Sequence, residues 1–157
     1  MKNLFILTAL VLSLKSFAAT TGDITISGTV DAELSLTLST NSYTTLDIEG
    51  GGDHTVATAN EVCNDLDGYK IYGYSTNGSE LQNTDNTNVS TSYTVKYDGS
   101  SAVSLGAGSA NKVQLKDSGA LTSSADEDSD IVVDVSAFAT APAGTYTDTI
   151  TLEIVAN

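Results

Sequence analysis

The chain has 157 residues, enough for one domain of ordinary size, and its 20 acidic residues and 6 lysines give a net charge of −14. It contains no arginine, no tryptophan, one histidine and one cysteine. So acidic a chain lacks the cationic surface with which proteins bind nucleic acids or anionic membranes. Most kinds of catalytic site need residues that this chain lacks or contains only once, so we expect neither an enzyme nor a cofactor.

Residues 1–18 have the pattern of a secretory signal peptide. Lys2 supplies the positive charge, residues 4–12 are an apolar run, and small residues precede a cut after Ala18 or, alternatively, after Ala19. The run is too short to cross a hydrocarbon core of ~30 Å. Cleavage would leave 20 acids and 4 lysines, a charge of −16, and a single cysteine, Cys63. We expect Cys63 to be free and buried, with an intermolecular disulfide as the alternative.

The next stretch alternates strictly between apolar or small residues and mostly polar ones. A strand presents alternate side chains to opposite faces, so one face of this stretch is suited to burial. Fifteen residues would span ~50 Å, longer than an ordinary strand, so we expect a division near Asp31. Residues 33–39 would be a core strand, and residues 23–30 an apolar edge that needs a partner. The apolar or small positions are Ile24, Ile26, Gly28, Val30, Ala32, Leu34, Leu36 and Leu38.

The remainder of the chain reads as short strands separated by glycine, asparagine and aspartate turns, without a helical apolar period. This pattern predicts an all-β fold, an antiparallel β-sandwich in one domain. The five tyrosines between residues 69 and 97 suit core and cross-strand packing better than a sugar-binding surface, which is the alternative. Strands are predicted at residues 23–30, 33–39, 43–48, 55–59, 69–75, 92–97, 112–116, 130–135 and 145–155.

Two groups of polar residues raise the question of a site. The run at residues 126–130 is predicted to be a solvated acidic loop, and the alternative is a calcium site with Asp126, Asp128 and Asp130 as candidate ligands. His54 and Cys63 lie nine residues apart with a predicted turn between them. They lack any sign of an oxyanion hole or an orienting group, so we expect no catalytic pair and no metal.

The C-terminal pattern mirrors the N-terminal one. Tyr146, Ile150, Leu152 and Ile154 share one face of a predicted strand, which Asp148 interrupts near the strand's solvated end. An apolar strand with a bare edge is a hazard that proteins cover or exploit. The N-terminal segment of one subunit could therefore pair beside this strand in the next subunit, by β-strand addition. In the alternative, residues 23–30 fold back onto their own domain.

The two ends of the mature chain resemble those of a known family. Asp-Ile-Thr-Ile-Ser-Gly-Thr-Val-Asp at residues 23–31 resembles the donor segment of alternate, colonisation-factor type chaperone–usher pilins. Residues 141–152, introduced by a proline, a glycine and a tyrosine, resemble their final strand and that of spore-coat-U-like and archaic pilins. Ala32 stands where the colonisation-factor pilins usually have proline, so the boundary of the donor segment is less sharply marked.

The resemblance implies an Ig-like sandwich that is incomplete and is completed by donor-strand exchange. Residues 19–31 would be the donor segment, with donor positions Ile24, Ile26, Gly28 and Val30, and residues 32–157 would be the Ig-like domain. The groove that accepts the donor would be flanked by the strand with Ile150, Leu152 and Ile154.

The resemblance also implies a function and partners. The protein would be a structural subunit of a fimbria or pilus on a Gram-negative cell surface, exported through the periplasm. Its partners would be copies of itself, a periplasmic chaperone and an outer-membrane usher, with no nucleic acid and no membrane insertion after signal cleavage. The alternative is a self-contained secreted Ig-like module that binds a glycan or calcium.

Overall fold

The computed structural model describes residues 20–157, so the predicted signal peptide lies outside the described residues. The chain divides into two units between Val30 and Asp31. No residue from 20 to 33 belongs to a helix or strand, so the strand predicted at residues 23–30 does not form here, where it has no ladder partner. None of the described residues forms a helix long and apolar enough to cross a membrane.

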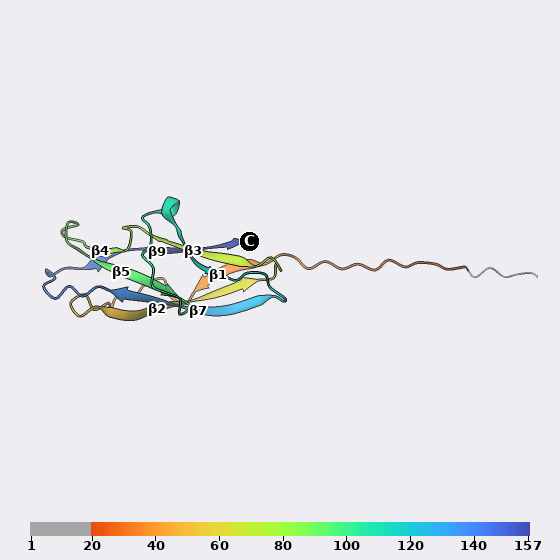
Figure 1. The fold of residues 1–157 in the computed structure, drawn as a ribbon, viewed down its shortest axis with the longest axis horizontal. Coiled ribbons are helices and arrows are strands. Elements are labelled where there is room, and N and C mark those ends of the chain that lie inside the picture. The colour runs from red at the N-terminus through yellow and green to blue at the C-terminus, as the bar shows by residue number, and fades with distance from the viewer. Residues whose placement is uncertain (1–19) are drawn as a thin grey trace, which may run out of the picture. The chain divides into compact units, whose positions relative to one another are not determined.

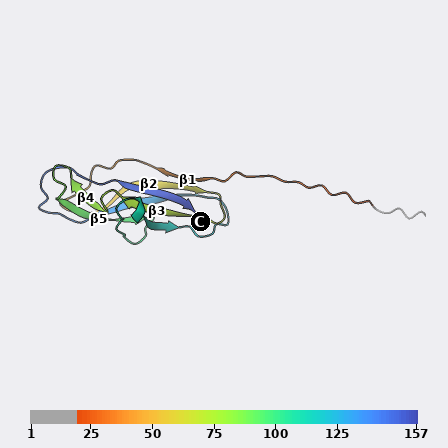
Figure 2. The same cartoon turned by 90° about the horizontal axis from the view of Figure 1, so that it is seen from above.

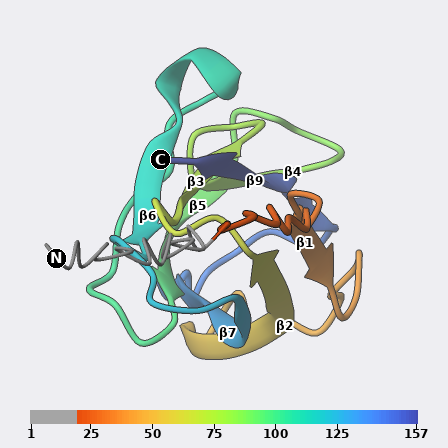
Figure 3. The same cartoon turned by 90° about the vertical axis from the view of Figure 1, so that its right-hand side faces the viewer.

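The unit of residues 31–157 is an antiparallel β-sandwich, which confirms the predicted fold class. In Figures 1 and 3, β2 and β7 lie in one layer and β3 and β9 in the layer opposite. The larger sheet runs in the order β1 (Leu34–Leu38), β2 (Gly52–Cys63), β7 (Ala125–Val135), β5 (Ser90–Tyr97), β4 (Glu80–Asn83) and β8 (Tyr146–Thr147). The smaller sheet runs in the order β6 (Val113–Asp117), β3 (Tyr69–Ser75) and β9 (Ile150–Ala156). A 3₁₀ turn, η1 (Ser109–Asn111), precedes β6.

The core lies between the two sheets and follows the period of two that strands impose. Along β3, Tyr69 and Ile71 are fully buried, whereas Tyr72 and Tyr74 on the opposite face are half-buried. The predicted tyrosine cluster is therefore divided between the core and the outer face of the smaller sheet. Cys63 is free and buried, as expected. The core side chains are Ala59, Cys63, Tyr69, Ile71, Leu81, Tyr93, Val95, Tyr97, Leu105, Ala125, Ile131, Val133 and Val135.

The predicted acidic loop is wrong, because residues 126–130 belong to strand β7. Asp126, Asp128 and Asp130 point outward and are exposed, whereas Ser129 between them is fully buried. Charged side chains on the solvent face of a strand need not be desolvated, so they do not prevent the ladder. The long ladder with β2, from Gly52 opposite Val135 to Cys63 opposite Ala125, outweighs the low strand propensity of the acids.

Two other strand predictions need correction, and one strand was not predicted. Residues 43–48 form no strand, since the chain departs from β2 after Ser39. The single strand predicted at residues 145–155 is broken into β8 and β9 at Asp148 and Thr149. β4, with only four residues, was not predicted, because it is too short to show a clear alternation.

A buried polar network joins the two sheets. The Glu61 side chain on β2 is fully buried, and it accepts hydrogen bonds from Tyr69 Oη at 2.6 Å and from Tyr97 Oη. Lys116 Nζ on β6 lies 2.8 Å from Glu61 Oε2 and also contacts Glu127 Oε2 at 3.0 Å and Ser129 Oγ at 3.0 Å. Because Tyr69 and Lys116 come from the smaller sheet and Glu61 from the larger, these bonds fix one sheet against the other.

The network keeps both charged partners ionised at neutral pH. Burial alone would raise the pKa of Glu61, but hydrogen bonds from Lys116, Tyr69 and Tyr97 outweigh it and hold that pKa below its usual value. Burial likewise opposes the charge on Lys116, but its bonds to Glu61 and Glu127 outweigh burial and raise the pKa of the ammonium group. Glu61 and Lys116 therefore form a buried ion pair, and removing either partner alone should strongly destabilise the fold.

Replacing Lys116 tests this network. Lys116→Met leaves the Glu61 carboxylate buried without its cation, so we expect the free energy of unfolding in urea to fall by about 3–5 kcal/mol. Lys112→Met is the matched control, because Lys112 Nζ pairs with the exposed Glu153 at 2.9 Å. It should cost at most about 1 kcal/mol. Equal losses in the two variants would contradict a special role for the buried pair.

The pKa of Glu61 predicts the response to acid. Because that pKa is lower in the folded chain than in the unfolded one, the carboxylate stabilises the fold above the unfolded-state pKa of ~4.3. This contribution is lost as the pH falls through the lower folded-state pKa. Urea midpoints between neutral pH and about pH 3 should therefore fall less for Glu61→Gln than for the wild type. Parallel pH profiles would show that Glu61 does not contribute.

Candidate functional site

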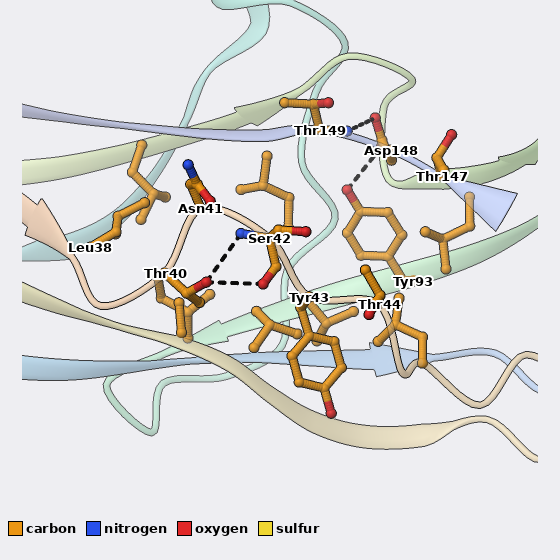
Figure 4. A pocket seen from close by; sticks show the side chains of 18 of the residues that line it. Leu38, Thr40, Asn41, Ser42, Tyr43, Thr44, Tyr93, Thr147, Asp148 and Thr149 are labelled. Carbon is orange, nitrogen blue, oxygen red and sulfur yellow. Dashed lines mark hydrogen bonds between the residues drawn. The ribbon is translucent and has the colours of Figure 1, made fainter. Parts of the chain in front are cut away.

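An open groove enters the core between two segments that are far apart in the sequence. Its volume is about 440 Å³, and residues 38–46 form one wall while residues 146–152 form the other (Figure 4). This is room for several side chains, since a water molecule occupies ~30 Å³ in the liquid. The floor consists of side chains from β2, β4, β5 and β7, namely Val56, Ala57, Leu81, Tyr93, Ile131 and Val133.

The first wall is a stretch of backbone that has left its sheet. β1 lies beside β2, as Figure 2 shows, and the last bond of this pairing runs from Ser39 N to Thr58 O at 2.8 Å. Beyond it, within the described part of the chain, residues 40–46 make no backbone–backbone hydrogen bond. Their only polar contacts are local ones between the Thr40 hydroxyl and the backbone of Ser42. This wall therefore presents unpaired backbone donors and acceptors.

The second wall is formed by β8, β9 and the break between them. β9 pairs with β3 along one edge, for example Leu152 opposite Gly73, and its other edge has no ladder partner among residues 20–157. Ile150 and Leu152 line the groove, and Ile154 is half-buried against the core farther along the same strand. The three residues predicted for the groove strand thus share β9, and two of them reach the cavity.

Apolar side chains along β1 are left partly uncovered, and of these Leu38 lines the groove. Leu34 is 39% exposed and Leu38 is 41% exposed, although the alternation assigns both to the face intended for burial. Leu36 is half-buried, and Tyr43 on the following wall is 40% exposed. The predicted core strand therefore forms, but its apolar face is not fully covered. An opposing layer of side chains is missing at this place.

A hydrogen-bonded aspartate closes one end of the groove. Asp148 Oδ2 accepts a bond from Tyr93 Oη at 2.9 Å, and its Oδ1 accepts one from Thr149 N at 2.7 Å (Figure 4). Oδ1 also accepts a bond from Asn77 N at 3.0 Å. Burial, with a smaller contribution from Asp148, raises the pKa of Tyr93, so the phenol stays protonated and donates. Asp148 was predicted at the solvated end of a strand. Tyr93 and Asp148 are 55 residues apart in the chain, and no sequence pattern indicates that they are in contact.

The predicted donor residues lie in the other unit and are exposed. Ile24 and Ile26 are each 89% exposed and Val30 is 87% exposed. A side chain built at Gly28 would meet no atom within 4 Å. Their role as donor positions remains a prediction, but the apolar surface that this role requires is uncovered.

The acidic residues considered as calcium ligands lie on the outer face of the larger sheet. Asn60 Nδ2 donates to Asp126 Oδ1 at 2.8 Å and to Asp128 Oδ1 at 3.1 Å, and Thr58 Oγ1 donates to Asp130 Oδ1 at 3.1 Å. Throughout residues 20–157, no group of three or more histidine, cysteine or acidic side chains is placed to hold a metal ion.

His54 and Cys63 are also kept apart by the fold. Both belong to β2, so the turn predicted between them is wrong. Nine residues of extended strand separate them by ~30 Å. They therefore cannot act as a nucleophile and its base.

Comparison with known proteins adds no relative to this picture. No protein-family model matches the chain, and the search of the curated proteins gives no match. The candidate function therefore depends on the groove and the exposed apolar segment.

Replacing Asp148 tests the closed end of the groove. Asp148→Ala leaves the Tyr93 hydroxyl and two backbone N–H groups without their acceptor, so we expect a loss of about 1–3 kcal/mol in urea unfolding. Asp148→Asn keeps one acceptor oxygen and should lose less. Tyr93→Phe removes only the donor hydroxyl and serves as the control. If Asp148→Ala were as stable as the wild type, these bonds would not stabilise the groove.

Proposed function

We propose that the protein is a structural subunit of a secreted surface fibre, in which residues 19–31 of one copy insert as a strand into the groove of the next. The observation that carries this proposal is a groove with an apolar floor and unpaired backbone along both walls. Such a groove matches the two needs of an inserted strand, since a strand presents backbone groups at both edges and side chains on its faces.

The candidate donor has the right pattern and length. Ile24, Ile26, Gly28 and Val30 share one face by alternation and would point toward the floor. Residues 23–30 would span ~26 Å as a strand, close to the ~23 Å of the seven residues of β9. The segment contains no proline, so every residue can donate to a ladder.

The energies indicate which interaction decides the stability of the complex. Burying Ile24, Ile26 and Val30 would contribute about 5–8 kcal/mol. Ordering eight residues costs ~1–2 kcal/mol each, which is comparable to that gain or larger. The ladder bonds, at a net ~1 kcal/mol each, therefore decide whether the inserted strand stays. Pairing along both walls makes about twice as many such bonds as an ordinary edge strand does.

Insertion from one copy into the next is head-to-tail, so it generates a filament unless the rotation closes a ring. The subunit would be exported through the periplasm of a Gram-negative bacterium to the cell surface. A periplasmic chaperone would fill the groove with a strand of its own before assembly, and an outer-membrane usher would exchange it. These partners follow from the resemblance of residues 23–31 and 141–152 to chaperone–usher pilins.

A charge on the donor face tests the proposal. Ile26→Asp should abolish assembly, because the carboxylate would be buried on the groove floor. Ser27→Asp adds the same charge on the opposite face of the segment and should still assemble at about 500 mM NaCl, where salt screens the added charge. Multi-angle light scattering after size exclusion measures the mass of each variant. Circular dichroism checks that the domain is folded, which we expect because Ile26 is exposed.

A second pair of variants tests the groove. Leu152→Asp points into the groove and should also prevent assembly, whereas Thr151→Asp, opposite Tyr74 on the outer face, should not. Assembly that survives both Ile26→Asp and Leu152→Asp in folded protein would contradict strand insertion. A wild-type chain that stays monomeric at every concentration would contradict it as well.

A further inference from the structure

Every lysine in residues 20–157 is already paired with a carboxylate of its own domain. The pairs are Lys70 with Asp117 at 3.6 Å, Lys96 with Asp53 at 2.7 Å, Lys112 with Glu153 at 2.9 Å, and Lys116 with Glu61 at 2.8 Å. Since this part of the chain also contains no arginine, no lysine or arginine side chain is left over to meet an acidic partner. Most of the acidic residues have no such cation beside them.

The groove carries such uncompensated charge at the end near Asp148. This carboxylate is satisfied by the neutral donors Tyr93, Asn77 and Thr149, and no lysine nitrogen lies within 4.0 Å of it. Asp47 directly follows the first wall, and its Oδ1 accepts a bond only from Gly50 N at 2.8 Å. Hydrogen bonds from neutral groups hold these carboxylates in place without removing their charge.

The candidate donor segment adds charge of the same sign. Asp23 and Asp31 flank its apolar residues, and residues 20–69 contain neither lysine nor arginine. A donor that enters the groove therefore brings two negative charges to a surface that is itself strongly acidic. Such repulsion reaches ~30 Å at 0.01 M ionic strength but only ~10 Å at 0.1 M.

We infer that repulsion between Asp23 and Asp31 of the donor segment and the acidic acceptor domain holds back strand insertion, so that ionic strength regulates assembly. This inference rests on the proposed function. Salt should accelerate assembly, which is the opposite of its effect on partners with complementary charges. Apolar burial and ladder hydrogen bonds together drive insertion, and salt does not weaken the burial of apolar surface. Subunits would thus stay apart in dilute medium and join in saline medium.

Light scattering of the folded full-length protein at neutral pH, in about 10 mM and about 500 mM NaCl, tests this inference. We expect assembly at the higher concentration to be faster by a factor on the order of ten or more. Asp23→Asn/Asp31→Asn should assemble faster than the wild type in the dilute buffer and at a similar rate in the concentrated one. The matched control is Asp126→Asn/Asp128→Asn, which removes two charges from the outer face of β7.

The outcomes separate this inference from the proposed function. It is overturned if the wild type assembles at one rate at both salt concentrations, or if the Asp23/Asp31 variant is no faster than its control in dilute buffer. In the second case salt would act by general salting-out or through net charge alone. Assembly of Ile26→Asp at about 500 mM NaCl, as fast as the wild type, would instead contradict strand insertion itself.

Discussion

Backbone N–H and C=O groups that have no partner constrain this protein more than any side chain does. The described chain satisfies most of them in two antiparallel sheets, but residues 40–46 and the outer edge of β9 have no backbone partner across the groove. On the apolar floor between them, Val56 and Ala57 are half-buried, whereas Leu81, Tyr93, Ile131 and Val133 are at most 4% exposed. A single added strand would pair both walls and cover the floor at once. Neither wall alone would specify a strand, because an exposed edge on its own is common in sheets.

The sandwich can tolerate this opening because other contacts fix the two sheets. The sheets are joined by the hydrogen bonds of the buried Glu61 carboxylate with Tyr69, Tyr97 and Lys116. Moving the sheets apart would break these bonds and leave an uncompensated charge in the core, which is costly. The groove floor uses Val56 and Ala57, earlier in the same strand that carries Glu61. One long strand, β2, thus supports both the rigid junction and the open groove.

The sequence predicts much of the fold, because strands report their faces directly. β3 has the predicted bounds, Tyr69–Ser75, since tyrosines and an isoleucine, which favour strands, lie there between two turns. The predictions failed where tertiary pairing decided the structure. The acids of residues 126–130 became part of β7 through the ladder with β2. Residues 43–48 have the alternation of a strand but no neighbour to pair with.

The residues of the candidate site were likewise predictable only where a local pattern marks them. Alternation singled out Ile150 and Leu152, but no local pattern shows that Tyr93 reaches Asp148 or that Leu38 borders a cavity.

Hydrogen exchange of the backbone amides of residues 40–46 tests strand insertion most directly. In the monomer these amides have no backbone acceptor among the described residues, and only the Ser42 amide donates to a side chain, so the others should exchange rapidly. In the assembled protein, alternate amides along this wall should become protected, because an inserted strand would accept their hydrogen bonds. Rapid exchange of all of them in the assembled protein would mean that the groove stays empty and that the subunits join elsewhere.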